Sequence, residues 1–226
     1  MTGYDCPECL NRGDFLIADE NGDLVYRECR CMTIRRNMKR MEKSGLAPLL
    51  EIYTLAKFQT PERWQEIAKE KATDYLKNGN SAWFVASGCV GSGKSHLCTA
   101  ICGELMTFGN DVRYMMWRDD GAQLKSSVND RDAYQRLILP LKTARVLYID
   151  DFWKGSSITD GDKNLAFELL NNRYVSGKRT IISTEKTIQQ ILDVDEATGS
   201  RIYQKSKGYY LRFPAEKNWR MKPDEK

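Results

Sequence analysis

The stretch Gly88-Cys89-Val90-Gly91-Ser92-Gly93-Lys94-Ser95 fits the phosphate-loop pattern G-x-x-x-x-G-K-[ST]. In this pattern the glycines let backbone N–H groups close on a polyphosphate, the lysine reaches the β- and γ-phosphates, and the serine hydroxyl binds Mg²⁺. The flanking residues agree, because 82–87 reads as a short buried strand and 94–108 as a helix that stops at Gly109. A phosphate at a helix N-terminus interacts favourably with the free amides and with the helix dipole. The sequence therefore predicts that residues 88–95 bind a nucleotide.

A second chemical motif is the run Val146-Leu147-Tyr148-Ile149-Asp150-Asp151, an apolar strand that ends in two acids. Alone, such a run is common, but here it follows a phosphate loop with another strand between them. In a phosphate-loop fold, an acid at the carboxyl end of a buried strand is where Mg²⁺ needs a protein partner. We therefore predict that Asp150 joins Ser95 in binding Mg²⁺ and that Asp151 orients an attacking water.

Further apolar runs predict the rest of a sheet. They span residues 111–117, 179–185 and 209–213, and helical patterns lie between them at 121–128, 132–139 and 163–176, with Pro140 expected to interrupt the second. Strands that alternate with helices are typical of an α/β fold, here with five parallel strands flanked by helices. The polar end of the run 179–185, Ser183-Thr184-Glu185, would lie at the sheet edge where such folds bind ligands.

Four of the seven cysteines form two close pairs near the N-terminus, Cys6 with Cys9 and Cys29 with Cys31. The loop between the pairs reads as a hairpin of two short strands, with Asn21-Gly22 as its turn. A segment this small cannot hold itself together by burial, so we predict a structural Zn²⁺ bound by the four thiolates. A catalytic zinc is disfavoured because four thiolates leave no open position. The alternative is four unrelated reduced cysteines.

Composition sets the broad class. The chain has 226 residues, with 35 basic and 31 acidic residues, so its net charge of +4 does not indicate a nucleic-acid binder. We find no run of about 18 apolar residues and no signal-peptide pattern at the N-terminus. We therefore expect a cytoplasmic protein with no membrane association, whose cysteines are reduced, buried or bound to metal.

The expected organisation has four parts. Residues 1–31 form the zinc-binding segment, 32–79 a helical linker, 80–214 the nucleotide-binding domain and 215–226 a charged C-terminal tail. The linker begins with a basic helix over 32–44, continues through a partly apolar connection over 47–58, and ends with a helix that Thr60-Pro61-Glu62 caps. The basic helix fits contact with phosphates or an acidic partner, and it fits a solvated linker face equally well.

At this point the chain resembles the DnaC/DnaI-like bacterial replicative helicase loaders, which are AAA+ P-loop ATPases, in the form that carries an N-terminal zinc segment. The shared segments follow one another in the same order and cover nearly the whole chain. They are the two cysteine pairs, 88–97 with its Gly-Lys-Ser-His-Leu run, 147–152, 181–185, Gly199-Ser200-Arg201-Ile202 and Asn218-Trp219-Arg220.

The resemblance implies a ring or spiral assembly of several copies. In this family the arginine of the Ser-Arg-Ile segment reaches the γ-phosphate of a neighbouring subunit. The resemblance therefore implies that Arg201 is an arginine finger that acts in trans. It likewise implies that Arg220 senses the bound nucleotide within its own chain and that His96 matches the His-Leu after the phosphate loop. For both arginines the alternative is a surface ion pair, and for His96 it is packing on the first turn of the helix. Cys89 inside the loop is either a tolerated small residue or a site of oxidation.

Two departures from the family pattern bear on catalysis. The end of the fourth strand is often Ser-Asn in the broader family, whereas this chain has Thr184-Glu185, so the side chain that contacts the γ-phosphate or the water is left open, with Thr184 as the catalytic candidate. The second acid is Asp151, where many AAA+ ATPases carry glutamate. A shorter acid lies farther from the water, which fits slow hydrolysis that a partner stimulates.

The function implied by the resemblance is an ATP-dependent helicase loader or remodeller in DNA replication that binds ATP·Mg²⁺, single-stranded DNA and a replicative helicase. Tyr114 and Trp117 are candidates to stack on DNA bases, although the strand pattern favours their burial. The alternatives are a transposition helper ATPase of the IstB kind, a small-molecule P-loop kinase, and a zinc-bearing interaction module that uses ATP as a structural switch. No recognisable pattern in the sequence encodes the identity of the helicase, the oligomer size or the DNA polarity. The same holds for whether the gene is chromosomal or belongs to a mobile element.

Overall fold

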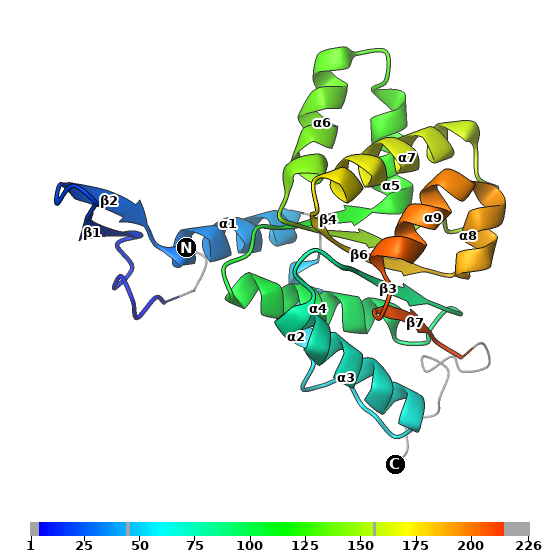
Figure 1. Cartoon of the computed structure of the whole chain (residues 1–226), viewed down its shortest axis with the longest axis horizontal. Coiled ribbons are helices and arrows are strands. Elements are labelled where there is room, and N and C mark those ends of the chain that lie inside the picture. The colour runs from blue at the N-terminus through cyan, green and yellow to red at the C-terminus, as the bar shows by residue number, and fades with distance from the viewer. Residues whose placement is uncertain (1–4, 44–45, 156, 215–226) are drawn as a thin grey trace.

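A five-stranded parallel sheet lies at the centre of the molecule (Figure 1), as the sequence predicts. The computed structural model of the chain describes residues 5–43, 46–155 and 157–214. The strand order is β4-β5-β6-β3-β7. The strands are β3 (Trp83–Ser87), β4 (Val112–Met116), β5 (Val146–Asp150), β6 (Arg179–Thr184) and β7 (Tyr210–Arg212). Each one agrees with a predicted strand to within two residues, although Trp117, expected to end the second, instead begins a helix.

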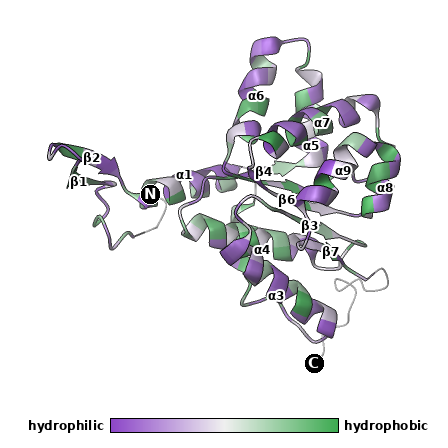
Figure 2. Ribbon diagram, viewed as in Figure 1, coloured by the Kyte–Doolittle hydropathy of each residue, from purple (hydrophilic) through white to green (hydrophobic). Residues whose placement is uncertain are grey.

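Helices cover both faces of the sheet, so the body has three layers. One face carries α2 (Ala47–Ile52), α3 (Arg63–Asn78) and α4 (Lys94–Thr107), and the other carries α5 (Trp117–Ser126), α6 (Arg131–Thr143), α7 (Asp160–Val175), α8 (Ile188–Val194) and α9 (Glu196–Lys205). Successive strand residues point to opposite faces, so Phe84 packs in the first cluster and Val85 in the second. Hydrophobic and hydrophilic residues alternate along helices such as α3 and α6 (Figure 2), because each buries one side against the body.

Three details differ from the predictions made from the sequence. The connection over 47–58 contains the short helix α2, and the segment before the last strand is helix α9, capped by the Asp195 carboxylate that accepts from Thr198 N. Pro140 does not interrupt α6, which continues to Thr143. Pro140 lacks the N–H that would bond to the carbonyl oxygen of Arg136, yet the helix continues past it to its end. The carbonyl oxygens of Leu141 and Ala144 at this end accept from the buried Arg173 guanidinium at 2.7 and 3.0 Å, which holds the last turn in place.

The N-terminal region extends away from the body as a hairpin, β1 (Asp14–Ala18) paired with β2 (Leu24–Glu28), at the outer end of α1 (Arg30–Lys43) (Figure 1). The helix begins two residues earlier than predicted, so Cys31 lies in its first turn. Its inner end packs on the edge strand β4. There the buried Asn37 side chain donates to Asn110 O at 2.6 Å and accepts from Val112 N at 3.2 Å. The helix therefore links the hairpin to the central sheet.

Candidate active site

The phosphate loop joins β3 to α4, and its backbone conformation requires glycine. Gly88, Gly91 and Gly93 all have positive φ angles, a region that side chains disfavour. A Cβ atom on Gly88 would lie 2.7 Å from the carbonyl oxygen of Phe213, so no larger residue fits at that position. These glycines give the loop the tight turn in which backbone N–H groups can surround an anion at the start of a helix.

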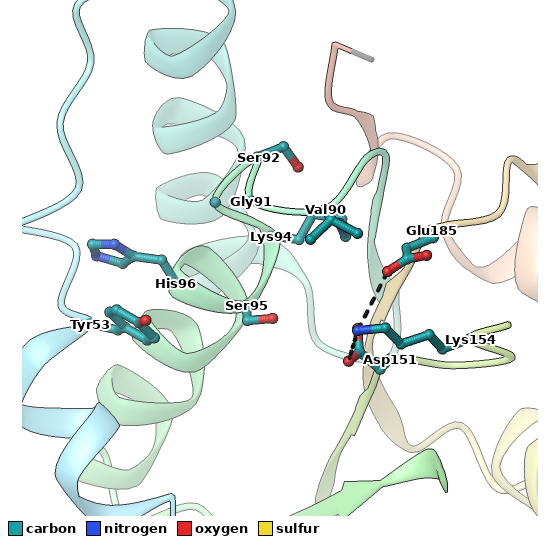
Figure 3. Close-up of a pocket in the computed structure, with 11 residues that line it drawn as sticks. Tyr53, Val90, Gly91, Ser92, Lys94, Ser95, His96, Asp151, Lys154 and Glu185 are labelled. Atoms are coloured by element: carbon teal, nitrogen blue, oxygen red, sulfur yellow. Dashed lines mark hydrogen bonds and ion pairs between the residues drawn. The ribbon is translucent and has the colours of Figure 1, made fainter. Parts of the chain in front are cut away.

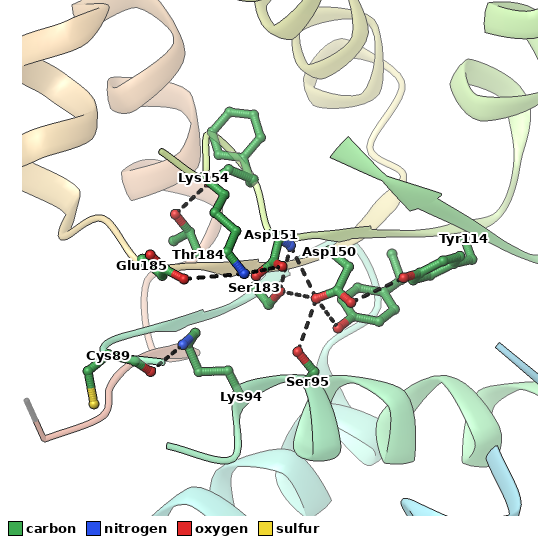
Figure 4. A network of polar contacts seen from close by, with 12 residues as sticks. Cys89, Lys94, Ser95, Tyr114, Asp150, Asp151, Lys154, Ser183, Thr184 and Glu185 are labelled. Atoms are coloured by element: carbon green, nitrogen blue, oxygen red, sulfur yellow. Dashed lines mark hydrogen bonds and ion pairs between the residues drawn. The ribbon is translucent and has the colours of Figure 1, made fainter. Parts of the chain in front are cut away.

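Lys94 lies in the first turn of α4 and is 5% exposed. Its Nζ donates to the carbonyl oxygen of Cys89 within the same loop at 2.6 Å (Figure 4). Burial lowers the pKa of Lys94, while the nearby carboxylates of Glu185 and Asp151 raise it. An anion beside this lysine would favour its charged form for the same electrostatic reason.

Ser95 and Asp150 meet at the carboxyl end of β5, where the Ser95 hydroxyl donates to Asp150 Oδ1 at 3.2 Å (Figure 4). Three more hydroxyls donate to the same carboxylate. They belong to Tyr114 at 3.1 Å, Tyr148 at 2.7 Å and Ser183. The two chemical motifs of the sequence therefore converge, and Asp150 is held in one orientation from several sides. Sequence reasoning missed the two tyrosines as partners of Asp150, because their hydroxyls meet it only after the strands pair.

Asp151 follows directly and turns the chain sharply, with a φ angle of +54°. Its N–H donates to Ser183 Oγ at 2.9 Å, which anchors the turn to β6. Its carboxylate faces Lys154, whose Nζ lies 2.8 Å from Asp151 Oδ2. Few non-glycine residues adopt such a conformation, and those that do are concentrated at functional sites.

A cavity of about 220 Å³ lies between the phosphate loop and these acids (Figure 3). Its lining combines the backbone of the phosphate loop with side chains from α4, the turn after β5, the end of β6 and the end of α2. The lining residues are Tyr53, Val90, Gly91, Ser92, Gly93, Lys94, Ser95, His96, Asp151, Lys154 and Glu185. Backbone amides and a lysine on one wall, with acids opposite, are what a Mg²⁺-bound polyphosphate requires.

Comparisons with known proteins agree with this geometry. Residues 14–198 match the family described as IstB-like ATP binding protein, which is well over half of the chain. The chain belongs to the IstB-like ATP-binding protein family. The phosphate loop, Asp150 and Asp151 all lie within the matched residues.

Relatives at the sequence level include a protein of a phage-like element and a replicative helicase loader. The phage-like element PBSX protein XkdC of Bacillus subtilis (strain 168) is 32% identical over 221 residues, which cover 92% of this chain and 82% of that protein. The replicative helicase loader DnaC of Escherichia coli (strain K12) is 27% identical over 170 residues, covering 74% of this chain and 68% of DnaC.

Solved structures share the fold. The DnaC helicase loader superposes with a TM-score of 0.60 at 18% identity, covering 73% of this chain and 98% of that one. DnaI gives 0.60 at 16% identity, with 76% and 92% covered. AMPPCP-bound DnaA from Aquifex aeolicus gives 0.61 at 22% identity, and this chain spans about half of it, 49%. The body of this IstB-like protein therefore has the AAA+ fold.

Of the two residues at the end of β6, Glu185 lines the cavity and Thr184 does not. The Thr184 side chain is fully buried, where its hydroxyl donates to Phe152 O at 2.8 Å and accepts from Lys186 N at 3.1 Å. Both hydrogen-bonding functions of the hydroxyl are thus occupied within the protein. The structure places Glu185, rather than the predicted Thr184, beside the acids of this IstB-like site.

His96 and Cys89 make contacts within the protein. The His96 ring stacks on Tyr53, with centroids 4.7 Å apart, and its Nε2 lies 3.0 Å from Thr54 O. Burial lowers the pKa of His96, so the ring is neutral at pH 7. Cys89 Sγ donates to Pro214 O at 3.2 Å. Tyr53 was missed from the sequence because it lies in a connection without any motif.

Arg201 lies on α9, where its side chain packs against α7 and does not line the cavity. Its Nε donates to Asn171 Oδ1 at 2.9 Å, its Nη1 donates to Ala197 O at 2.7 Å, and its guanidinium lies 4.8 Å from the centroid of the Phe167 ring. A finger that acts in trans needs a neighbouring copy, so its role stays a prediction. Arg220 lies outside the described residues.

Cys6, Cys9, Cys29 and Cys31 come together between the hairpin and the start of α1. All four are buried, and their Sγ atoms lie within 4.8 Å of one another. Two of the sulfur–sulfur distances are 3.7 Å, for Cys6 and Cys29, and 3.5 Å, for Cys9 and Cys31. Zn–S bonds of about 2.3 Å place tetrahedral ligands about 3.8 Å apart, so this donor set fits Zn²⁺.

Among the residues that the structure describes, no helix has the length and apolar character needed to cross a membrane.

Proposed function

We propose that this protein is an ATPase of the AAA+ class. Lys94 and the amides of residues 88–95 would bind the phosphates of ATP, and Ser95 with Asp150 would hold Mg²⁺, which would neutralise charge on the phosphates. The observation that carries this proposal is the 3.2 Å contact between Asp150 and Ser95, a residue that lines the cavity. Membership in a family of ATP-binding proteins supports it independently.

Hydrolysis would be slow until a partner or a neighbouring copy completes the site. Asp151 would orient the attacking water, and as a shorter acid than glutamate it would lie farther from that water. Arg201 would supply positive charge to the active site of the next copy in a ring or spiral. An arginine finger in trans makes hydrolysis depend on assembly.

The biological role that we propose is helicase loading or remodelling in DNA replication. The support is the 27% identity to the replicative helicase loader DnaC, together with the AAA+ fold that DnaC and DnaI share with this chain. The four-cysteine hairpin, closed by Zn²⁺, and the basic helix α1 would grip the helicase. Because the hairpin extends away from the ATPase body, it can reach a partner without covering the nucleotide cavity.

Single-stranded DNA is the second proposed ligand. Tyr114 and Trp117 are poor candidates to stack on its bases, because the Tyr114 hydroxyl donates to Asp150 and the Trp117 side chain is 4% exposed. Recognition of the DNA backbone by basic side chains is therefore the mode that we favour.

The test is to mix the purified protein with the replicative helicase of its host, ATP and single-stranded DNA, and to measure complex formation and ATP turnover. The proposal expects an ATP-dependent complex and turnover that rises on mixing. Lys94→Ala is expected to abolish both. Asp151→Asn is expected to keep ATP binding and lose turnover, whereas a module that uses ATP only as a structural ligand would be unaffected by this change.

The second candidate is a transposition helper ATPase, which the IstB-like family match favours. It shares the ATPase body, so the two roles differ in the partner. A complex with a transposase, and none with the helicase, would replace the first role by the second and leave the proposed ATPase activity in place.

A further inference from the structure

The nucleotide cavity holds one more carboxylate than its proposed chemistry uses. Asp150, beside the cavity, would bind Mg²⁺ and Asp151 would orient water, but Glu185 lines the cavity together with Asp151 and has no such task. A triphosphate carries several negative charges, and a like charge beside it is unfavourable unless a cation intervenes. Glu185, at the end of β6, therefore needs a positively charged partner inside the same cavity.

Lys154 is that partner. Its Nζ lies 2.8 Å from Asp151 Oδ2 and 3.5 Å from Glu185 Oε1, so a single ammonium bridges the two acids (Figure 3). Asp151 is the main cause that raises the pKa of Lys154. Its side chain is 41% exposed and can move. It lines the same cavity as Lys94 and Ser95.

The backbone around Lys154 fixes where its side chain begins. The sharp turn at Asp151 is anchored by Phe152 and Trp153, which are 0% and 1% exposed, and Lys154 N donates to Asp151 O at 3.1 Å. Only the conformation of the long Lys154 side chain remains free to vary.

Further hydrogen bonds tie this turn to the end of β6. Phe152 N donates to Ser183 O at 2.8 Å, Thr184 Oγ1 donates to Phe152 O at 2.8 Å, and Lys186 Nζ donates to Gly155 O at 3.1 Å. The two segments that carry Lys154 and Glu185 thus form one unit. A charge added to the cavity would act on both residues together.

We propose that Lys154, held in place by Glu185, contacts the γ-phosphate of ATP bound in the same chain. This inference rests on the proposed ATPase function. When a triphosphate enters, the ammonium moves from Asp151 to a γ-phosphate oxygen and keeps its pairing with Glu185. Asp151 is then free to orient the water, and a diphosphate, which lacks the γ-phosphate, leaves Lys154 on Asp151. The pair would thereby distinguish ATP from ADP.

The experiment compares Lys154→Met with a matched control, Lys163→Met. Lys163 also pairs with an aspartate three residues away, Asp160 at 3.0 Å, and its side chain is 38% exposed, but it lies on α7 outside the cavity. Affinities for ADP and for a non-hydrolysable ATP analogue are measured by calorimetry, with single-turnover hydrolysis of ATP alongside.

For Lys154→Met we expect affinity for the ATP analogue to fall about 10- to 100-fold, the size of one charge-assisted hydrogen bond, with ADP affinity unchanged. Hydrolysis is expected to fall as well. Lys154→Arg should keep most of the preference for the analogue, because the charge remains. In the double variant Lys154→Met with Glu185→Gln, removal of the unpaired acid should restore part of the affinity.

An unchanged ratio of ATP-analogue to ADP affinity in Lys154→Met would overturn the inference. Faster hydrolysis in this variant would also overturn it, because Lys154 would then only inhibit Asp151. Circular dichroism confirms that the variant is folded. The proposed ATPase function is tested separately, because it requires that the unaltered protein bind ATP and that Lys94→Ala lose this binding. Failure of the Lys154 inference leaves that result untouched.

Discussion

The ATPase body and the four-cysteine hairpin are ordered by different forces. In the body, all residues of β3 and β6 are buried between two hydrophobic clusters. In the hairpin, all five residues of β2 are exposed, and the buried cluster consists of the four cysteines alone. Burial of apolar surface can therefore stabilise the body by itself, whereas the hairpin needs bonds through its sulfur atoms.

The comparison is tested most strongly by removing the Zn²⁺ that we propose the four cysteines bind. With a zinc-selective chelator, in excess Mg²⁺, we expect residues 14–28 to lose all protection from amide hydrogen exchange while the body keeps its protection and its ATP affinity. The expected effect is large, because structural Zn²⁺ supplies about 10–16 kcal/mol of apparent binding free energy in small domains.

Cys9→Ser should reproduce the effect of the chelator, and Cys102→Ala provides the control, since Cys102 is buried in α4 of the body. Zinc content by mass spectrometry should drop only in the first variant. A hairpin that stays protected without zinc would show that the two regions are not ordered differently after all.

A core substitution tests the other half of the comparison. Phe84 is fully buried in β3 and packs on Tyr75, with ring centroids 5.3 Å apart. Phe84→Ala should lower the free energy of unfolding of the body by about 3–5 kcal/mol, measured by denaturant titration, and leave the zinc content unchanged. Phe108→Ala, at a ring that is 62% exposed, is the control and should change it by less than about 0.5 kcal/mol.

The connection between the two regions has an intermediate expected effect. Asn37→Ala removes two hydrogen bonds to the backbone around β4, which should cost about 1–3 kcal/mol. We expect hydrogen exchange to increase in α1 while ATP affinity stays the same. Asn78→Ala, which removes an exposed hydrogen bond to Asp74, should have little effect. Equal effects of the two changes would mean that α1 is not attached through Asn37.

The smallest effect is expected at the surface of the hairpin. A hydrogen bond from Arg36 lowers the pKa of Glu28, so this ion pair stabilises the hairpin above the ordinary glutamate pKa, and the contribution disappears as the pH falls through the lowered value. Both side chains are about half exposed, which limits the contribution to less than about 1 kcal/mol. An NMR titration of the Glu28 carboxyl, with and without Arg36→Ala, measures the shift. A titration that Arg36→Ala does not alter would contradict this assignment.

Much of the fold and part of the site followed from the sequence, because periodicity and short motifs are local. Residues 88–95 and Asp150 could be placed at one sheet edge since parallel strands end together. The side chains that complete the cavity could not be placed from the sequence. Lys154 reaches Asp151 only through a left-handed turn, Thr184 points into the protein while its neighbour Glu185 faces the cavity, and Tyr53 arrives from a distant helix end. Such placements depend on tertiary packing.

The contact between Asn37 and the backbone of Val112 has a consequence for solubility. β4 lies at one border of the sheet, where an unpaired row of amides and carbonyls invites a foreign strand to add itself. The asparagine side chain occupies one of those amides, and Arg40 covers the neighbouring Asp111. The inner end of α1 thus covers part of that border and leaves fewer of its amides open to a foreign strand.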